Sequence, residues 1–555
     1  MRGGVERIVA ALVVFAGTFV FRFLTVDFTN DHFTHLTRAR QIVLGDLPIR
    51  DFFDPGQLLQ YYVSAAAQVV FGFNLFGEAV VTIGFMALAA ALTFAVSRDL
   101  SGSRVIAACA TTLAVAALPR LYNYPKAFLY VLAIWGFLRY ARRPRLWALS
   151  GLALLVATAF LLRHDHGLYI WVAATVFLTI FHWRDRRQVL RATVTCGVMT
   201  CLLLLPFAVY VQQAGDLTGY LRTAQRSGRM VARSLDATGP LVTDEQAIAD
   251  ESSGLGLHRR VFTGDHALAW FHYGTVMLPY LAIAVLVRRR WTGRSRDPAE
   301  TAVIGALAVL NLIVNQTLIR GSPLTRLADV AAPAMVLGAW LAGQWLVRRA
   351  GTGAPGGRLR LKPVAAIGFF AITLWSVSTV GGAGRQIRQL HLKSGPAAAW
   401  AQLVRVNRWL HLRPIDAWAP EPATGIRALA RYVLECTQPT DRLFVTWFAP
   451  EIAFYAERGF AGGQVHLLPG WHQSASDQQL TVSRLRRQQV PIVLADAGGD
   501  AVFRRRFSIV HDYVYQHYVV AADSDFGGSR IIRVLVERGR TPARVYQPLA
   551  LPCYR

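Results

Sequence analysis

Residues 27–73 read DFTNDHFTHLTRARQIVLGDLPIRDFFDPGQLLQYYVSAAAQVVFGF, and they separate two apolar runs of membrane-spanning length. This stretch, which we call the first loop, carries five aspartates: Asp27, Asp31, Asp46, Asp51 and Asp54. Carboxylates next to membrane-spanning segments mark candidate functional positions, because charge is costly in that environment. We therefore interpret the first loop as half of an active site.

The spacing of apolar residues predicts two short helices in the first loop. Asn30 or Asp31 can cap the first helix, which ends at Gly45. The second follows Asp54-Pro55, interpreted as an N-cap and a first-turn proline. Its apolar and polar residues take opposite faces: Leu58, Tyr62, Ala65, Val69 and Phe73 on one, Gln57, Gln60, Ser64 and Gln68 on the other. A helix divided in this way lies in a membrane interface more readily than it spans the bilayer.

The composition is that of a membrane protein with some water-exposed mass. Of the 555 residues, 54% are hydrophobic, and the mean hydropathy is +0.33. These values are too apolar for a large soluble protein. The net charge of +26 would suit a nucleic-acid-binding protein, but most arginines lie in short clusters between apolar runs, as the positive-inside rule requires. We therefore exclude nucleic acid as a partner.

About eleven apolar runs have the length, or nearly the length, of a membrane-spanning helix. They lie at residues 8–24, 75–96, 105–118, 127–141, 146–162, 167–182, 190–211, 267–287, 301–318, 328–347 and 363–382. The loops between them alternate between arginine-rich and mixed charge, which places the N-terminus inside and the C-terminal region outside. No small-residue cleavage site follows the first run, so we interpret it as a retained helix rather than a signal peptide.

From residue 384 the composition becomes that of a soluble α/β domain. Strand-like runs lie at 442–447, 490–495, 507–509 and 531–537, and helical stretches at 426–435 and 451–458. The sequence thus predicts a polytopic α-helical domain over residues 1–383, with its first outer loop at 25–74, and an extracytoplasmic α/β domain over 384–555. Cys436 and Cys553 fall in the second domain, where an oxidising compartment would allow them to pair.

Ionisable residues gather at the outer ends of the apolar runs, whereas the runs themselves are nearly free of charge. They are Asp27 and Asp31; Arg120 and Lys126; Arg163, His164, Asp165 and His166; and Arg320, Arg326 and Asp329. A coupled transporter usually carries an ionisable group near the bilayer midplane. Cations and carboxylates gathered at one depth instead suit an enzyme that works on a lipid-linked phosphate, with its charged head among arginines and lysine.

Each of these residues also has a purely structural interpretation. Arg120 and Arg326 can extend from helix ends to lipid headgroups, and Asp31 can simply cap a helix. Residues 163–166 have the composition of a metal-ligand cluster, but three adjacent side chains on a helix do not all face one ion. We therefore predict no cofactor, and a divalent cation is an alternative that no motif supports.

The order of one span, a carboxylate-bearing loop, many further spans and an outer domain resembles the GT-C superfamily. Its members are integral-membrane glycosyltransferases of the protein-mannosyltransferase and aminoarabinose-transferase type. The architecture of the whole membrane part carries this resemblance. At the level of residues it rests on DHFTHLTRARQIVLGDLPIRDFFDPG, residues 31–56, and less specifically on the Tyr-Pro-Lys of 124–126.

The resemblance implies roles for individual residues. Asp31 would be the general base that deprotonates the acceptor hydroxyl, with Asp27 as the reserve candidate. His32 follows Asp31 where the family has a second carboxylate, and this departure puts a metal or second-acid role in doubt. Lys126, Arg163 and Arg320 would bind the phosphate of the leaving group, and His164, Asp165 and His166 join them as donor-binding candidates.

We therefore expect an inverting glycosyltransferase in the cytoplasmic (inner) membrane. It would move a sugar from a polyprenyl-phosphate donor to a glycan, lipid or protein acceptor on the outer face of that membrane. One alternative is a lipid or glycan transporter, which moves its substrate without forming a bond. Another is a non-enzymatic envelope assembly protein, for which changes to the carboxylates of the first loop would be harmless.

Overall fold

The computed structural model describes residues 2–223, 264–293, 297–320, 323–346, 368, 371–376, 383–390 and 395–555. The chain divides into two compact units. The membrane unit comprises Met1–Val26, Thr82–Val209 and Val231–Leu403, and the α/β unit comprises Asp27–Val81, Tyr210–Met230 and Val404–Arg555. The first loop thus belongs to the same unit as the C-terminal region, although most of the chain separates them in sequence. The domain boundary expected at residue 384 stays a prediction.

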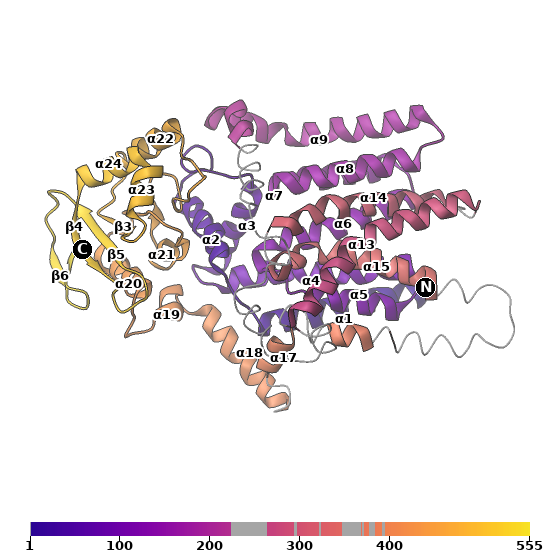
Figure 1. Ribbon diagram of the computed structural model, residues 1–555, viewed down its shortest axis with the longest axis horizontal. Helices are drawn as coiled ribbons and strands as arrows, with labels where there is room; N and C mark the ends of the chain where they lie inside the picture. Colours follow the sequence, from indigo (N-terminus) through magenta and orange to yellow (C-terminus); the bar gives the residue numbers. More distant parts are fainter. Residues whose placement is uncertain are drawn as a thin grey trace. The chain divides into compact units, whose positions relative to one another are not determined.

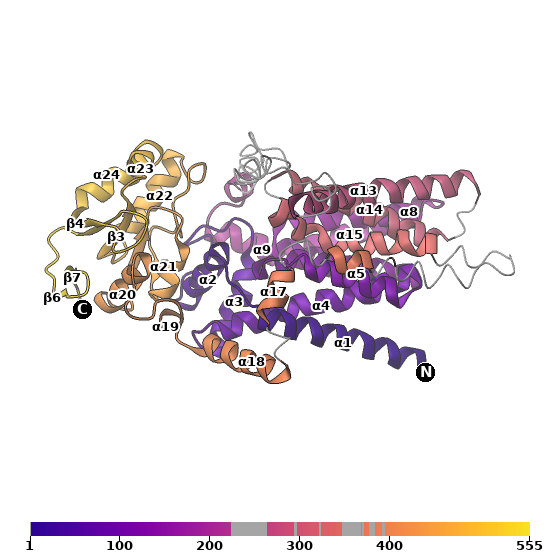
Figure 2. The ribbon, with the colours of Figure 1, turned by 60° about the horizontal axis from the view of Figure 1, so that its bottom comes forward.

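Long helices form most of the membrane unit. They are α1 (Arg2–Leu24), α4 (Phe76–Ser101), α5 (Arg104–Ala116), α6 (Tyr124–Arg142), α7 (Leu146–Leu162), α8 (His164–Phe181), α9 (Arg186–Ala214), α13 (Gly264–Trp291), α14 (Pro298–Asn315) and α15 (Pro323–Leu346), followed by the short α17 (Ala383–Gln389). Figures 1 and 2 show α4 to α8 and α13 to α15 running alongside one another. Ten of the predicted apolar runs coincide with these helices, and the run at 363–382 lies mostly outside the described residues.

Within the part of the chain that the structure describes, six helices contain a segment that is long and apolar enough to cross a membrane: α1, α4, α9, α13, α14 and α15. The chain is therefore a multi-pass membrane protein. Two of the other predicted spans are shorter, since α5 has 13 residues and α7 has 17, and a helix needs about 20 apolar residues to cross the hydrocarbon core. The expected number of eleven spans stays a prediction.

The α/β unit contains a mixed five-stranded sheet with the order β2-β1-β3-β5-β4. Its strands are β1 (Arg442–Val445), β2 (Gly459–Phe460), β3 (Ile492–Asp496), β4 (Tyr518–Ser524) and β5 (Ile532–Glu537), and β6 (Arg544–Tyr546) pairs with β7 (Leu551–Cys553) in a separate ribbon. β1 is parallel to β2 and β3, whereas β5 is antiparallel to β3 and β4.

Helices cover both faces of this sheet. The C-terminal helices are α18 (Pro396–His411), α19 (Pro414–Trp418), α20 (Ile426–Cys436), α21 (Pro450–Tyr455), α22 (Ala475–Leu485), α23 (Asp500–Arg506) and α24 (Ser508–His517). α22, α23 and α24 lie on one face and α20 on the other (Figures 1 and 2). On the first face Phe444, Val493 and Leu535 of the strands pack with Val482 of α22 and Val510 of α24.

Three of the four predicted strands are confirmed as β1, β3 and β5. The prediction at 507–509 was wrong, because Phe503, Phe507, Val510 and Val514 are buried at the three- and four-residue spacing of a helix. Strand β4 was missed because most of its side chains are exposed or half-buried. It is an edge strand, so it lacks the apolar pattern by which buried strands are found.

The two helices predicted in the first loop are confirmed as α2 (Asn30–Val43) and α3 (Leu58–Phe71). Their predicted caps were wrong. The N-cap of α2 is Thr29, and Asp31 lies in the first turn, where the helix dipole favours a negative charge. Asp54 Oδ1 accepts the N–H groups of Gly56 and Gln57, both at 2.9 Å. This is an Asx turn, and it delays the start of α3.

Much of the polar face of α3 is buried, and its apolar residues are exposed toward its C-terminal end, although Ala65 of the apolar face is buried. Gln60 and Ser64 are buried, whereas Val69 and Val70 are 70% and 73% exposed. α3 packs against α2, and Gln68 Nε2 donates a 3.3 Å hydrogen bond to the Leu36 carbonyl. An outward apolar face is what a helix at a membrane surface presents, and the interfacial position of α3 stays a prediction.

Specific contacts make the first loop an integral part of the α/β unit. The side-chain amide of Gln41 forms two hydrogen bonds with the backbone of β2. Its Nε2 donates to the Phe460 carbonyl, and its Oε1 accepts the Phe460 N–H, both at 3.1 Å. Asp46 receives two hydrogen bonds from the guanidinium of Arg442, at 2.7 and 3.0 Å. These contacts join residues 419 and 396 positions apart in sequence.

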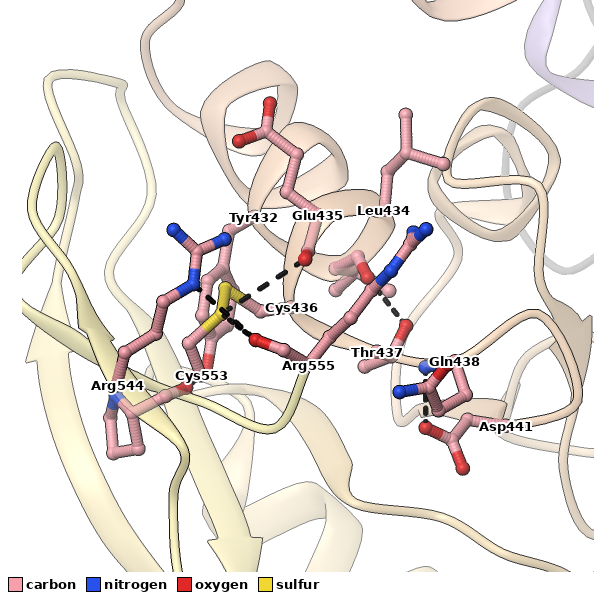
Figure 3. Close-up of a disulfide and its surroundings, with 12 residues drawn as sticks. Tyr432, Leu434, Glu435, Cys436, Thr437, Gln438, Asp441, Arg544, Cys553 and Arg555 are labelled. Atoms are coloured by element: carbon pink, nitrogen blue, oxygen red, sulfur yellow. Dashed lines mark hydrogen bonds between the residues drawn. A yellow bond between two sulfur atoms is a disulfide. The ribbon is translucent and has the colours of Figure 1, made fainter.

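Cys436 at the end of α20 and Cys553 in β7 form a disulfide, with their Cα atoms 4.5 Å apart (Figure 3). Two hydrogen bonds flank it. The Tyr432 hydroxyl donates to the Pro552 carbonyl at 2.6 Å, and the Tyr554 N–H donates to the Cys436 carbonyl at 2.9 Å. The bridge therefore fastens the C-terminal strand to α20.

Replacing Cys436 by serine is expected to destabilise the α/β unit. The bridge joins residues 117 positions apart, and a loop of that length contributes roughly 4–5 kcal/mol in the chain-entropy model. Thermal unfolding of the purified protein tests this, and a reductant should lower the midpoint of the wild type toward that of the variant. Cys201→Ser, which removes an exposed free thiol, should unfold like the wild type. Equal midpoints for Cys436→Ser and the wild type would contradict the prediction.

Candidate active site

A buried ion pair lies at the start of α6 in the membrane unit. Lys126 Nζ is 2.6 Å from Asp329 Oδ2 of α15, and the two side chains are only 8% and 3% exposed. Asn123 Nδ2 donates to the other carboxylate oxygen, Oδ1, at 2.9 Å. A 3₁₀ turn, Leu121–Asn123, leads directly into α6, whose first turn contains Pro125. This local structure brings Asn123 and Lys126 to the same carboxylate.

A second charged group lies where α7 ends and α8 begins. Arg163 Nε donates to Asp165 Oδ1 at 2.8 Å, and the same oxygen accepts the His166 N–H at 3.0 Å. A Cβ on Gly167 would lie only 2.5 Å from Phe160 Cα, so the absence of a side chain at Gly167 lets α8 start close against α7. Arg163 and Asp165 are 31% and 35% exposed, which makes them the more accessible of the two charged pairs.

The side chains of residues 164–166 take three different partners. His164 stacks on Phe160, with ring centroids 4.0 Å apart, and its Nδ1 hydrogen-bonds to the Phe160 carbonyl at 2.8 Å. Asp165 faces Arg163, and His166 Nδ1 hydrogen-bonds to the buried hydroxyl of Tyr130 in α6. Asp165 and His166 also lie near each other, with His166 Nε2 3.7 Å from Asp165 Oδ1.

The two charged pairs are linked through α6. Tyr130 lies one turn after Lys126, and its hydroxyl hydrogen-bonds to His166, whose backbone N–H donates to Asp165. Two cations and two carboxylates cancel, so the cluster is formally neutral when His166 is uncharged. Lys126, Arg163, Asp165 and His166 were predicted as site residues, and the structure brings them together in the membrane unit.

Asp329 and Arg22 are the residues of this site that the sequence analysis left out of the candidate set. A narrow crevice lined mainly by small and apolar side chains of α1, α4, α5, α6 and α15 includes Arg22, Ala127 and Ala328. Ala127 and Ala328, which line this crevice, are the sequence neighbours of Lys126 and Asp329. Arg22 is buried, and one of its Nη atoms donates to the Pro119 carbonyl at 2.8 Å. The available signal was a lone arginine inside an apolar run.

Arg320 belongs to the candidate set, and Arg120 is a further cation that the sequence analysis named at the end of an apolar run. Arg320 ends the 3₁₀ segment Gln316–Arg320, and its side chain lies outside the described part of the structure. Its role as a phosphate ligand stays a prediction. Arg120 is half-buried, and its Nη1 donates to the Tyr122 hydroxyl at 3.3 Å, which favours a local structural role.

Asp46, Asp51 and Asp54 of the first loop accept hydrogen bonds that fix its local structure. Asp46 pairs with Arg442, and Asp51 accepts from Arg50 and from the Leu47 N–H. Asp54 Oδ2 accepts a 2.9 Å hydrogen bond from the Tyr220 hydroxyl. Burial and the Asp54 carboxylate raise the pKa of Tyr220 far above its ordinary value, so Tyr220 is a neutral donor here. Asp31, half-buried in the first turn of α2, and the exposed Asp27 stay the predicted bases of the first loop.

His32, which stands in place of the family's second carboxylate, has a structural role. Its Nε2 lies 2.7 Å from Glu78 Oε1, and the two side chains are 1% and 3% exposed. Phe28 packs edge-on against the same imidazole. The pair joins the first turn of α2 to the first turn of α4 within the α/β unit. It therefore holds the backbone next to Asp31.

Replacing Glu78 by alanine is expected to lower the stability of the protein by about 1–3 kcal/mol, because a buried imidazole loses a hydrogen-bond partner. Thermal unfolding in detergent measures this effect. Glu6→Ala is the matched control, because Glu6 pairs with Arg104 on an exposed surface and such pairs contribute little. Equal losses in the two variants would show that the buried pair has no special role.

No protein-family model matches the sequence, and no curated protein matches it. The fold is similar to that of an oligosaccharyltransferase of Archaeoglobus fulgidus in its apo form, with 14% identity, a TM-score of 0.45, and coverage of 92% of this chain and 72% of that one. ArnT of Cupriavidus metallidurans bound to undecaprenyl phosphate has 14% identity and a TM-score of 0.45, with 96% and 97% covered.

A third similar structure is the oligosaccharyltransferase AglB of Archaeoglobus fulgidus in complex with an inhibitory peptide and a dolichol-phosphate. It has 12% identity and a TM-score of 0.45, with 96% of this chain and 75% of that chain covered. The similarity to these three structures is one of fold. At such identities the similarity concerns the path of the chain, and the chemistry of the site has to follow from its own residues.

Proposed function

We propose that this protein is a GT-C-type membrane glycosyltransferase that uses a polyprenyl-phosphate sugar as donor. Transfer breaks the bond between the anomeric carbon and the phosphate oxygen, whose electron pair stays with the phosphate. The acceptor oxygen forms the new bond to the anomeric carbon, and its proton passes to Asp31. Lys126 and Arg163 bind the phosphate and stabilise the charge that develops on it.

The observation that carries the proposal is the buried Lys126–Asp329 pair, whose helices α6 and α15 also line an apolar crevice. Burying an ion pair can cost more desolvation energy than the pair returns, so a purely structural pair at this place is unexpected. A buried cation on a helix that also lines an apolar crevice suits a ligand with one apolar part and one anionic part. A lipid phosphate has this character, and ammonium and guanidinium groups are the common ligands of phosphate.

We place the reaction on the outer face of the cytoplasmic membrane, with the N-terminus inside and the α/β unit outside. The Cys436–Cys553 disulfide supports this orientation, because disulfides persist in oxidising compartments. The arginine-rich loops support it as well, since positive charge is retained on the cytoplasmic side. The acceptor is a glycan, a lipid or a protein reached from that side.

Sugar transfer from radiolabelled polyprenyl-phosphate sugars, assayed with purified protein and with membranes that overexpress it, tests the proposal. The expected result is a labelled acceptor product and release of polyprenyl phosphate. Membranes supply the native acceptor, so the absence of product there from every donor would overturn the enzyme assignment. Movement of labelled lipid across vesicles without bond formation would then favour a transporter.

A further inference from the structure

We infer that Asp329 is a positioning residue for the donor phosphate and acts through Lys126. This inference rests on the proposed function and extends it to a residue that does not itself touch the substrate. A bare carboxylate next to a phosphate-binding lysine would be expected to compete with the phosphate. The geometry of this carboxylate points to a different role.

Both oxygens of Asp329 are already occupied. Oδ1 accepts from Asn123 and Oδ2 accepts from Lys126, so the carboxylate is held from two sides and offers little repulsion in a new direction. Lys126 has three N–H donors, and within the described residues only Asp329 accepts from it. The ammonium group is therefore anchored by one bond and keeps two donors for an incoming anion.

Burial gives this anchor its importance. The ammonium group of a lysine side chain that is only 8% exposed would be strongly disfavoured in its charged form without a nearby carboxylate. It would also be free to turn on its four-carbon stem. Asp329 thus keeps Lys126 charged and oriented toward the phosphate, and Asn123 keeps Asp329 in place. The charge that Lys126 meets grows during the reaction, because a phosphodiester with one negative charge becomes a phosphate monoester with a charge of about −1.5 to −2 at neutral pH.

Binding of farnesyl phosphate, a short isoprenoid monophosphate, to the purified full chain tests the inference. Asp329→Asn and Lys126→Met are each expected to weaken binding by roughly 10- to 100-fold, the usual effect of a hydrogen bond to a charged group. The double variant should bind no more weakly than Lys126→Met alone, because Asp329 acts through Lys126. Asp329→Glu should bind better than Asp329→Asn. The control is Asp99→Asn, which removes a carboxylate paired with Arg142 at the other end of α6 and should bind like the wild type.

A second binding measurement distinguishes a lost orientation of Lys126 from general damage to the site. The methyl diester of farnesyl phosphate carries one negative charge, and the monoester carries more. Loss of the orientation of Lys126 should therefore weaken binding of the diester less than it weakens binding of the monoester. A general distortion of the site would weaken both ligands alike, and that result would overturn the inference. If Asp329→Asn does not fold, Asn123→Ala provides the same test. It should weaken binding of farnesyl phosphate several-fold in the wild type, and it should not weaken binding further when Lys126 is already replaced by methionine.

The remaining outcomes distinguish the inference from the proposed function. Wild-type affinity in Asp329→Asn together with a loss in Lys126→Met would overturn the inference and leave the phosphate site standing. A further loss in the double variant would also overturn it, because Asp329 would then act independently. Wild-type affinity in Lys126→Met would remove the phosphate site itself, and the inference would fall with it.

Discussion

Replacing Asp31 by asparagine is expected to lower the rate of sugar transfer by about 10²- to 10⁴-fold, the usual contribution of a general base. The asparagine amide keeps the size of the side chain but cannot accept the proton of the acceptor hydroxyl. Asp31 lies in the first turn of α2, one residue before the buried His32, so the backbone at this point is held firmly. Donor binding should remain close to that of the wild type, since the phosphate ligands belong to the membrane unit.

The carboxylates of the same loop provide the comparison for Asp31→Asn. Asp51→Asn changes a residue whose partners are Arg50 and the Leu47 N–H, and it should retain transfer activity. Single-turnover rates with saturating donor separate chemistry from binding. If Asp27→Asn is inactive and Asp31→Asn is active, the base is Asp27 and the enzyme class survives. If both variants transfer sugar at the wild-type rate, the first loop does not supply the base.

Replacing Lys126 by methionine is expected to lower kcat/KM for the donor by about 10²- to 10³-fold. This is the usual effect of losing one group that stabilises a developing negative charge. Both KM and kcat should change, because Lys126 meets the phosphate in the bound donor and again in the leaving group. Lys126→Arg should recover only part of the activity. A planar guanidinium does not reproduce the geometry of an ammonium group.

Stability has to be measured beside activity for Lys126→Met, because the variant leaves the buried Asp329 without its cation, a defect that costs about 3–5 kcal/mol in other proteins. Arg139→Met is the matched control. Arg139 lies in the last turn of α6, with its guanidinium 5.4 Å from the ring centroid of Trp135. It should transfer sugar normally. Full activity of a folded Lys126→Met variant would exclude Lys126 from the donor site.

Much of this architecture could be predicted from local patterns. Apolar runs and the arginines between them indicated a multi-pass membrane protein, and ten of those runs are helices. The periodicity of the first loop predicted α2 and α3, because helical spacing is a property of neighbouring residues. The same reasoning named Lys126, Arg163, Asp165 and His166 as members of a site, since charge at the ends of apolar helices is rare enough to stand out.

Several predictions failed where partners distant in sequence decide the outcome. The second helix of the first loop was expected to follow directly on Asp54, but that carboxylate takes the N–H groups of an Asx turn and the hydroxyl of Tyr220. The division of α3 into two faces was correct, yet no local rule showed that the polar face would be the buried one. That choice depends on α2, which offers the Leu36 carbonyl to Gln68.

The order and hydrophobicity of the residues thus establish where the helices run, which segments suit a bilayer and where charge meets its boundary. All of these follow from the burial preferences and spacing of adjacent side chains. Which charge meets which partner is settled by packing: Lys126 and Asp329 are 203 residues apart, Asp46 and Arg442 are 396 apart, and the two bridged cysteines are 117 apart. Such pairs form only after helices and strands have come together, because a buried charge or thiol takes the partner that the surrounding core places beside it.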